Sequence, residues 1–133
     1  MSKFPILFSG FFLAMGASAH ALAQELFIIA NPSTSVTVAD IREIFLGEKQ
    51  FADSLKVVPV DNAAVQADFL GKVLKMDAAR YSATWAKKSF RDGINPPASK
   101  SGDAEVLNYV KSTPGAVGYV ATKPSNVTVV QKY

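Results

Sequence analysis

The chain has 133 residues, with 14 Lys or Arg, 11 Asp or Glu, and a formal net charge of +3. Nucleic-acid-binding proteins usually concentrate far more positive charge on one face. Here the basic residues are spread along the chain, and their densest group is Lys87, Lys88 and Arg91. We therefore expect a solvated helix face at this group and no nucleic-acid partner.

The first 23 residues have the three-part pattern of a secretory signal peptide. Lys3 supplies the basic start, Phe4–Met15 is an apolar run, and small residues alternate from Ala17 to Ala23. This run is shorter than the ~20 residues that a membrane span needs, so export is favoured over an N-terminal anchor helix. We predict a signal peptide at 1–23, one mature domain at 24–133, and a periplasmic protein without stable membrane insertion.

Cleavage after Ala23 would remove His20, the one histidine, from a chain that has no cysteine. The remaining chain would lack the imidazole and thiol groups of Ser-His-Asp and Cys-His catalysis and of the usual zinc sites. Asp40 and Glu43 could pair as carboxylates, but the helix dipole favours acids in a first turn without any chemistry. We therefore expect no enzyme activity, no catalytic residue, no metal site, no cofactor and no disulfide.

The first predicted elements are a strand and an amphipathic helix. Glu25–Asn31 is a short apolar run that favours a buried strand, and the polar loop Asn31–Ser35 follows it. Thr37 can cap the next helix, with Asp40 three residues later in the first turn, and Gly47 can end it. The core-facing positions of this helix have helical spacing and are Ile41, Ile44 and Phe45.

A second strand and two more helices are predicted next. The segment 55–61 indicates a strand, and apolar residues recur at helical spacing from Ala63 to Leu74. Asp77 can cap the helix that follows. The positions of that helix expected to face the core are Tyr81, Trp85 and Phe90.

The last third of the chain is predicted as a loop, a helix and two strands. The segment 91–102 contains two Gly and two Pro and indicates a loop, and 103–113 indicates a fourth helix. Gly115 is expected to supply a turn and Gly118 a close approach to the strand that contains it. Strands separated by helices predict one α/β domain with a mostly parallel sheet flanked by helices.

Four segments follow one another along the chain: a helix ending in Phe45-Leu46-Gly47, the strand-to-helix segment 57–74, Trp85 followed by Phe90 and Pro96-Pro97, and Pro114–Val120. In this order they resemble one lobe of the phosphate-type ABC transporter substrate-binding proteins, and most closely a short, stand-alone subgroup. The resemblance implies the class II periplasmic binding fold, a two-lobed clamp that closes on phosphate. Full-length members are more than twice as long, so the resemblance implies a single lobe here.

The family's phosphate loop is only partly kept. Family members carry an Arg and then Ser-Gly-Thr at the turn after the corresponding strand. Here Val58 and Pro59 lie in the arginine region, and Ala63, Ala64 and Val65 replace Ser-Gly-Thr. The aspartate remains as Asp61, and it adds negative charge where a dianion would bind.

Two interpretations of this turn stay open. Asp61, Asn62, Ala63 and Ala64 can form a ligand site at the helix start, or Asp61 or Asn62 can cap that helix and fill the place. The loop after the first strand offers Ser33 and Thr34 as a second ligand or partner surface.

The sequence accordingly supports two functional hypotheses. The first is an exported solute-binding domain for a small anion or polar solute, with most phosphate-loop residues missing. The second is a ligand-free module on the same scaffold that binds a periplasmic or membrane protein.

Overall fold

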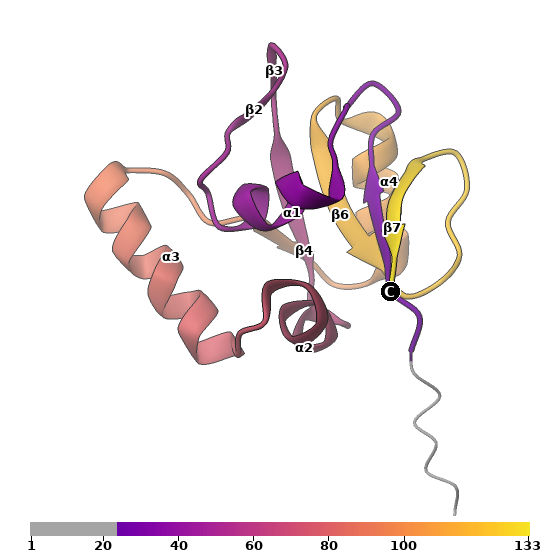
Figure 1. The fold of residues 1–133 in the computed structure, drawn as a ribbon. Coiled ribbons are helices and arrows are strands. Elements are labelled where there is room, and N and C mark those ends of the chain that lie inside the picture. The colour runs from indigo at the N-terminus through magenta and orange to yellow at the C-terminus, as the bar shows by residue number, and fades with distance from the viewer. Residues whose placement is uncertain (1–23) are drawn as a thin grey trace, which may run out of the picture.

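The computed structural model of the protein describes residues 24–133, and the predicted signal peptide at 1–23 lies outside the described residues. Strands occupy the centre of the molecule, with helices around them (Figure 1). The strands are β1 (Phe27–Ala30), β2 (Phe51–Ala52), β3 (Leu55–Lys56), β4 (Val58–Asn62), β5 (Ala98–Lys100), β6 (Ala116–Val120) and β7 (Thr128–Lys132). The helices are α1 (Val38–Phe45), α2 (Gln66–Phe69), the π-helical turn η1 (Leu70–Leu74), α3 (Ala78–Asp92) and α4 (Asp103–Ser112).

Five strands form one sheet in the order β5-β4-β6-β1-β7, and β2 and β3 form a separate hairpin. Strand β4 pairs in parallel with β5 and β6, whereas β1 pairs antiparallel with β6 and β7. The predicted α/β class, with a central sheet flanked by helices, is confirmed. The three parallel strands β5, β4 and β6 have their carboxyl ends at one edge, which is where open α/β sheets bind ligands.

Apolar side chains cover both faces of the sheet because successive residues of a strand point to opposite sides. In β1, Ile28 and Ala30 belong to the core that also contains the buried residues of α1, α2 and α3. Phe27 and Ile29 belong to the second core, against α4. Burial on both sides explains why this strand is a continuous apolar run rather than an alternating one.

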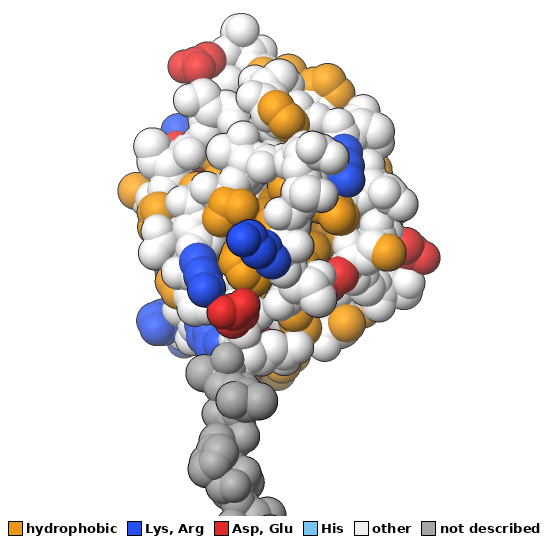
Figure 2. Space-filling model, turned by 90° about the vertical axis from the view of Figure 1, so that its right-hand side faces the viewer, with side chains coloured by type: hydrophobic (Ala, Val, Ile, Leu, Met, Phe, Trp, Pro, Cys, Tyr) orange, Lys and Arg blue, Asp and Glu red, His pale blue; other side chains and the backbone are white. Residues whose placement is uncertain are grey.

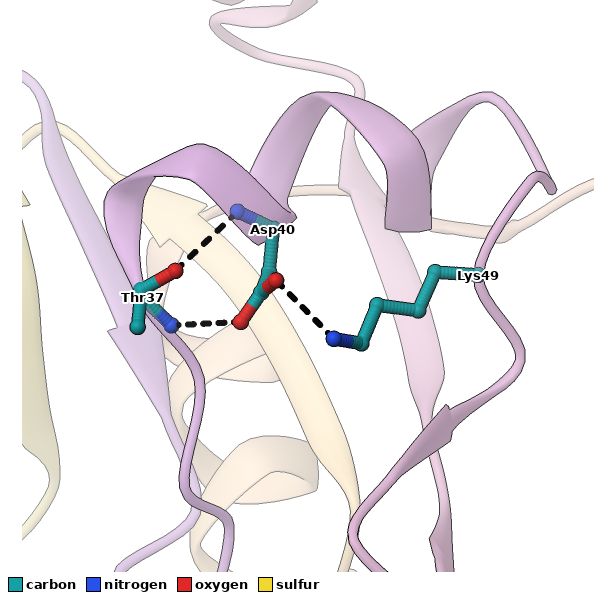
Figure 3. Close-up of polar contacts among 3 residues, drawn as sticks. All are labelled: Thr37, Asp40 and Lys49. Carbon is teal, nitrogen blue, oxygen red and sulfur yellow. Dashed lines mark hydrogen bonds and ion pairs between the residues drawn. The ribbon is translucent and has the colours of Figure 1, made fainter.

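Helix α1 begins at the predicted cap. The Oγ1 atom of Thr37 accepts a hydrogen bond from the backbone N–H of Asp40, and the Asp40 carboxylate accepts one from the Thr37 N–H at 2.9 Å (Figure 3). The Nζ atom of Lys49 lies 2.9 Å from the other carboxylate oxygen. Gly47 follows the helix with a φ of 71°, so both predicted ends are confirmed.

The segment from Ala63 to Leu74 is helical but irregular. Its α-helical part has four residues, and the π-helical turn η1 continues it as far as Leu74. Asp77 then caps α3, as predicted, because its Oδ1 atom accepts a hydrogen bond from the Arg80 N–H at 2.8 Å.

The prediction for Phe90 is wrong. Tyr81 and Trp85 are buried as expected, whereas the side chain of Phe90 is 96% exposed. Tyr81 and Trp85 are four residues apart and share one helix face, but Phe90 lies five residues beyond Trp85. At 100° per residue this places Phe90 about 140° from Trp85 around the helix, away from the buried face.

Strand β5 lies inside the segment 91–102, which the sequence predicts as a loop. Its residues are polar or small, and the strand exists because β4 pairs with it along Val60–Asn62. Strand β2 is likewise absent from the predicted elements, whereas the predicted strand 55–61 is divided into β3, which pairs with β2, and β4. β2 and β5 have two and three residues, with no apolar alternation that could mark them.

The two predicted roles of glycine near β6 are confirmed. Gly115 has a φ of 88° and forms the turn before the strand. A Cβ atom on Gly118 would lie 2.9 Å from Cγ1 of Val106, so only glycine lets α4 pack this closely on β6.

Side chains of both charges are scattered over the face shown in Figure 2, between areas of hydrophobic side chains. Within residues 24–133, no helix has the length and apolar character needed to cross a membrane.

Candidate functional site

Asp61 is a buried carboxylate at the carboxyl end of β4. Its Oδ1 atom accepts a hydrogen bond from the hydroxyl of Tyr119 on β6, and its Oδ2 atom accepts one from the hydroxyl of Tyr81 on α3. Both bonds are 2.8 Å long, and only 3% of Asp61 is exposed. The acid therefore joins two neighbouring strands and a helix.

Burial dominates the electrostatics of this group. It raises the pKa of the Asp61 carboxyl above its usual range, and the hydrogen bonds from Tyr119 and Tyr81 act in the opposite direction. Burial and the nearby charge of Asp61 also raise the pKa of both tyrosines. The two hydroxyls therefore stay protonated and donate to the carboxylate.

Asn62 is fully buried and fixes the turn after β4. Its Nδ2 atom donates to Oδ1 of Asp103 at 2.8 Å and to the Tyr119 carbonyl at 3.1 Å. Asp103 in turn accepts hydrogen bonds from the backbone N–H groups of Ala121 and Thr122. These hydrogen bonds connect the chain segment that follows β4 with the segment that follows β6 at this edge of the sheet.

The backbone amides of the turn are already occupied. The Ala63 N–H donates to the Lys100 carbonyl at 2.9 Å, the Ala64 N–H to Oδ1 of Asn62 at 3.1 Å, and the Val65 N–H to the Asn62 carbonyl at 3.1 Å. Since each of these donors has an acceptor within the protein, none points freely outward as a phosphate loop requires.

Neither Asp61 nor Asn62 fills the predicted role of helix cap. Helix α2 begins after Val65 without a side-chain cap, and both carboxylate oxygens of Asp61 bond to tyrosines instead. Asn62 accepts the Ala64 N–H inside the turn. The prediction that Asp61 or Asn62 caps the helix is therefore wrong, because the strand directs Asp61 into the core and Asn62 stabilises the turn that precedes the helix.

A pocket of about 390 Å³ lies beside Asp61, between the end of β4, the helix α3 and the segment 96–99. This volume is within the usual range for small-molecule sites. The polar residues that line the pocket are Asp61, Gln66, Tyr81, Ser82, Ser89 and Ser99. Lys and Arg are absent from its lining, which consists entirely of described residues.

The structure does not bring Ser33 and Thr34 to this pocket. Strand β1 runs antiparallel to β6, so its carboxyl end lies beside Ala116, where β6 begins. Asn62 instead lies beside Tyr119, near the end of β6. Ser33 donates to Oδ1 of Asn31, and Oγ1 of Thr34 accepts the N–H of Gly115, so both side chains stabilise loops.

Tyr81, Tyr119 and Ser89 were not among the residues proposed from the sequence for this site. Tyr81 and Tyr119 are 20 and 58 residues from Asp61 along the chain. The sequence does indicate that both tyrosines face the core and that an acid ends a predicted strand. It does not specify the strand order, which brings the two tyrosines to Asp61.

No known protein-family model and no curated protein matches the sequence. The structure is similar to that of a protein assigned as a phosphate ABC transporter substrate-binding protein from Clostridium perfringens, solved with bound phosphate. The TM-score is 0.57 and the identity 14%, over 80% of this chain and 44% of that chain. An ABC-type phosphate transport receptor from Vibrio cholerae matches with a TM-score of 0.48, 18% identity, and 80% and 45% coverage.

The first of these matches shows the fold, and this chain spans less than half the length of that protein. The resemblance seen in the sequence to a substrate-binding scaffold is therefore confirmed at the level of the fold.

Proposed function

We propose that this protein is an exported, periplasmic solute-binding domain that has lost the phosphate site of the proteins it resembles. The observation that carries the proposal is the pocket beside Asp61, at the edge where the carboxyl ends of β5, β4 and β6 meet. Its location agrees with the general position of ligand sites in open α/β sheets. The fold is similar to that of a protein assigned as a phosphate substrate-binding protein, which was solved with phosphate.

Two features argue against phosphate as the solute. The turn amides at Ala63, Ala64 and Val65 donate to acceptors within the protein. The pocket contains the Asp61 carboxyl and no basic side chain among its lining residues, so its electrostatic potential disfavours a dianion.

The phosphate part of the proposal is tested by amide chemical shifts in a ¹⁵N-labelled sample. We expect the signals of Ala63, Ala64 and Val65 to stay unchanged up to millimolar phosphate at constant ionic strength. A saturable shift of these three signals would show that the turn opens and holds the anion. Cell fractionation tests export, and we expect the protein in the periplasmic fraction with its N-terminus at Gln24.

A protein-interaction module is the second candidate, and two observations favour it. Phe90 is 96% exposed on α3, so its whole ring is available for contact with a partner. A second pocket of about 490 Å³ lies between α1, the start of β4 and the segment 93–98. Trp85 lines both this pocket and the one beside Asp61.

The second candidate is tested by affinity capture from periplasmic extract, with Phe90→Ser compared against the wild type. We expect an interaction through α3 to be lost in this variant while its free energy of unfolding changes by less than about 0.5 kcal/mol, as is usual for exposed sites. Equal capture by both proteins would remove Phe90 from the interface. Val129→Ser on β7, whose side chain is 45% exposed, is the matched control.

A further inference from the structure

We propose that the pocket beside Asp61 binds a small, uncharged, polyhydroxylated solute, of the sugar or polyol class. The inference rests on the proposed solute-binding function and names the class of solute. Three properties of the pocket carry it: the hydrogen-bonding groups of its lining, an unpaired buried hydroxyl, and a rigid apolar wall.

The hydrogen-bonding groups are mostly neutral. Four of the six polar lining residues carry hydroxyl groups, namely Tyr81, Ser82, Ser89 and Ser99, and a fifth is the amide Gln66. Hydroxyls both donate and accept, and an amide offers one group of each kind. This set matches the alternating donors and acceptors of a polyol, whereas a phosphate would need donors and positive charge.

Asp61 is the one charged residue in the lining, and its two tyrosine partners already compensate part of its charge. Each carboxylate oxygen accepts one tyrosine hydroxyl at 2.8 Å. A carboxylate has about four acceptor positions, so it retains capacity for solute hydroxyl donors. The negative charge excludes anions from the pocket. We favour a neutral solute over an amine because one partly compensated carboxylate faces five neutral polar groups.

The hydroxyl of Ser89 provides an independent observation. Its Oγ atom is inaccessible to solvent and has no hydrogen-bond partner among residues 24–133. Buried polar atoms in folded proteins are nearly always paired, so such an exception calls for an explanation. Ser89 lines the pocket, and a change of its side-chain rotamer would turn the hydroxyl toward a bound solute, whose own hydroxyl would supply the missing partner.

The apolar wall is rigid. It consists of Trp85, Ala86, Pro96 and Pro97. The indole N–H of Trp85 donates to the Phe45 carbonyl at 3.0 Å, which fixes the ring, and the prolines restrict the opposite segment. Apolar side chains beside convergent polar groups can contact the C–H groups of a sugar while its hydroxyls meet the serines.

Trp85 is the one tryptophan of the chain and lines both pockets, so its fluorescence detects a bound solute and the amide signals of Ser89 and Ser99 assign it to the pocket beside Asp61. The probes are glycerol, glucose and myo-inositol as neutral polyols, acetate and phosphate as anions, and putrescine as a cation. We expect at least one polyol to change the Trp85 emission saturably and to shift the amide signals of Ser89 and Ser99. The anions and putrescine should leave those signals unchanged.

Ser89→Ala is the decisive variant. We expect it to bind the polyol about threefold to tenfold more weakly, as for the loss of one hydrogen bond, without loss of thermal stability. Ser99→Ala should weaken binding similarly and serves as a second test at the other side of the pocket. Ser112→Ala, at the end of α4 and outside the pocket lining, is the matched control and should bind as the wild type does.

The outcomes separate this inference from the proposed function. Saturable binding of acetate or putrescine without polyol binding would overturn the inference and leave solute binding intact. Polyol binding that neither Ser89→Ala nor Ser99→Ala weakens would also overturn it, because the solute would then lie elsewhere. The absence of any shift with all six probes would count against both.

Discussion

Tyr119 and Asp61 are joined by a 2.8 Å hydrogen bond across the neighbouring strands β6 and β4. The ring of Tyr119 is stacked on that of Phe69, with centroids 3.9 Å apart and planes inclined by 2°. Its hydroxyl therefore reaches Asp61 from a side chain that is fixed in the core. The candidate site is consequently built on packed elements, with an acid whose position depends on aromatic packing.

Replacement of Asp61 by Ala should destabilise the protein by more than the loss of a helix cap would. The variant leaves the buried hydroxyls of Tyr81 and Tyr119 without their acceptor, and each such group costs about 1–3 kcal/mol. We expect the free energy of unfolding, measured by urea denaturation, to fall by about 2 kcal/mol or more. A loss near 1 kcal/mol, typical of an N-cap, would contradict this assignment.

The pH dependence of stability should reveal the burial of Asp61. Because the pKa of this carboxyl is raised in the folded state, folding is favoured while the group is protonated. That contribution is complete below the ordinary value of 3.8 and is lost as the pH rises through the folded pKa. Asp61→Asn removes the titration, so its stability relative to the wild type should increase from pH 3 to pH 7.

Urea denaturation of both proteins at each pH measures this difference. Groups that titrate equally in both proteins cancel when the two are subtracted. A relative stability that is constant with pH, or that decreases, would show that folding does not raise the pKa of the Asp61 carboxyl.

Asp103 should show the opposite pH dependence. Partial burial alone would raise the pKa of its carboxyl, but hydrogen bonds from Thr122, Ala121 and Asn62 together lower it. Its contribution is therefore present above pH 3.8 and is lost as the pH falls through the folded pKa. We expect Asp103→Asn to cost about 1 kcal/mol at pH 7 and progressively less on acidification.

Asp92→Asn is the control for Asp103→Asn, because Asp92 pairs with the neighbouring Arg91 on the exposed end of α3. An exposed pair of this kind contributes little, so this variant should unfold as the wild type does at neutral pH. Equal losses in both variants would mean that Asp103 does not hold the segment after β6.

The sequence predicts the helix ends well because their signals are local. Thr37 and Asp40 are three residues apart, Asp77 precedes its helix directly, and both caps are present as predicted. The buried face of α1 is also predicted from a local signal, because a helical period of 3.6 residues determines which positions share a face.

The sequence predicts the candidate site less well because the site depends on contacts between distant segments. Aspartate is a common helix cap, but the carboxylate of Asp61 accepts hydrogen bonds from Tyr81 and Tyr119 instead. The order of the strands and the packing of α3 bring these two tyrosines to it. Strand β5 exists through its pairing with β4. Ser33 and Thr34 lie at the other end of the sheet because β1 is antiparallel to β6, a direction that no local pattern encodes.

Alanine substitution at two glycines should have opposite effects on stability. Gly47 has a φ of 71°, and a Cβ atom there would lie 2.6 Å from Cη2 of Trp85. The left-handed conformation alone costs a non-glycine residue about 1–2 kcal/mol, and the contact with Trp85 adds to that cost. Gly71 lies in the helical turn η1, and a Cβ atom there would meet nothing within 4 Å. Gly71→Ala should therefore stabilise the protein by about 0.5–1 kcal/mol, since alanine has the lower conformational entropy when unfolded.

Urea denaturation followed by Trp85 fluorescence measures both glycine variants. Only Gly47→Ala should also change the emission of the folded state, because only that substitution displaces the indole that lines the candidate pocket. If Gly47→Ala were as stable as the wild type with unchanged emission, the end of α1 would have to be free to move away from α3. The wall that Trp85 provides for a solute would then not be rigid.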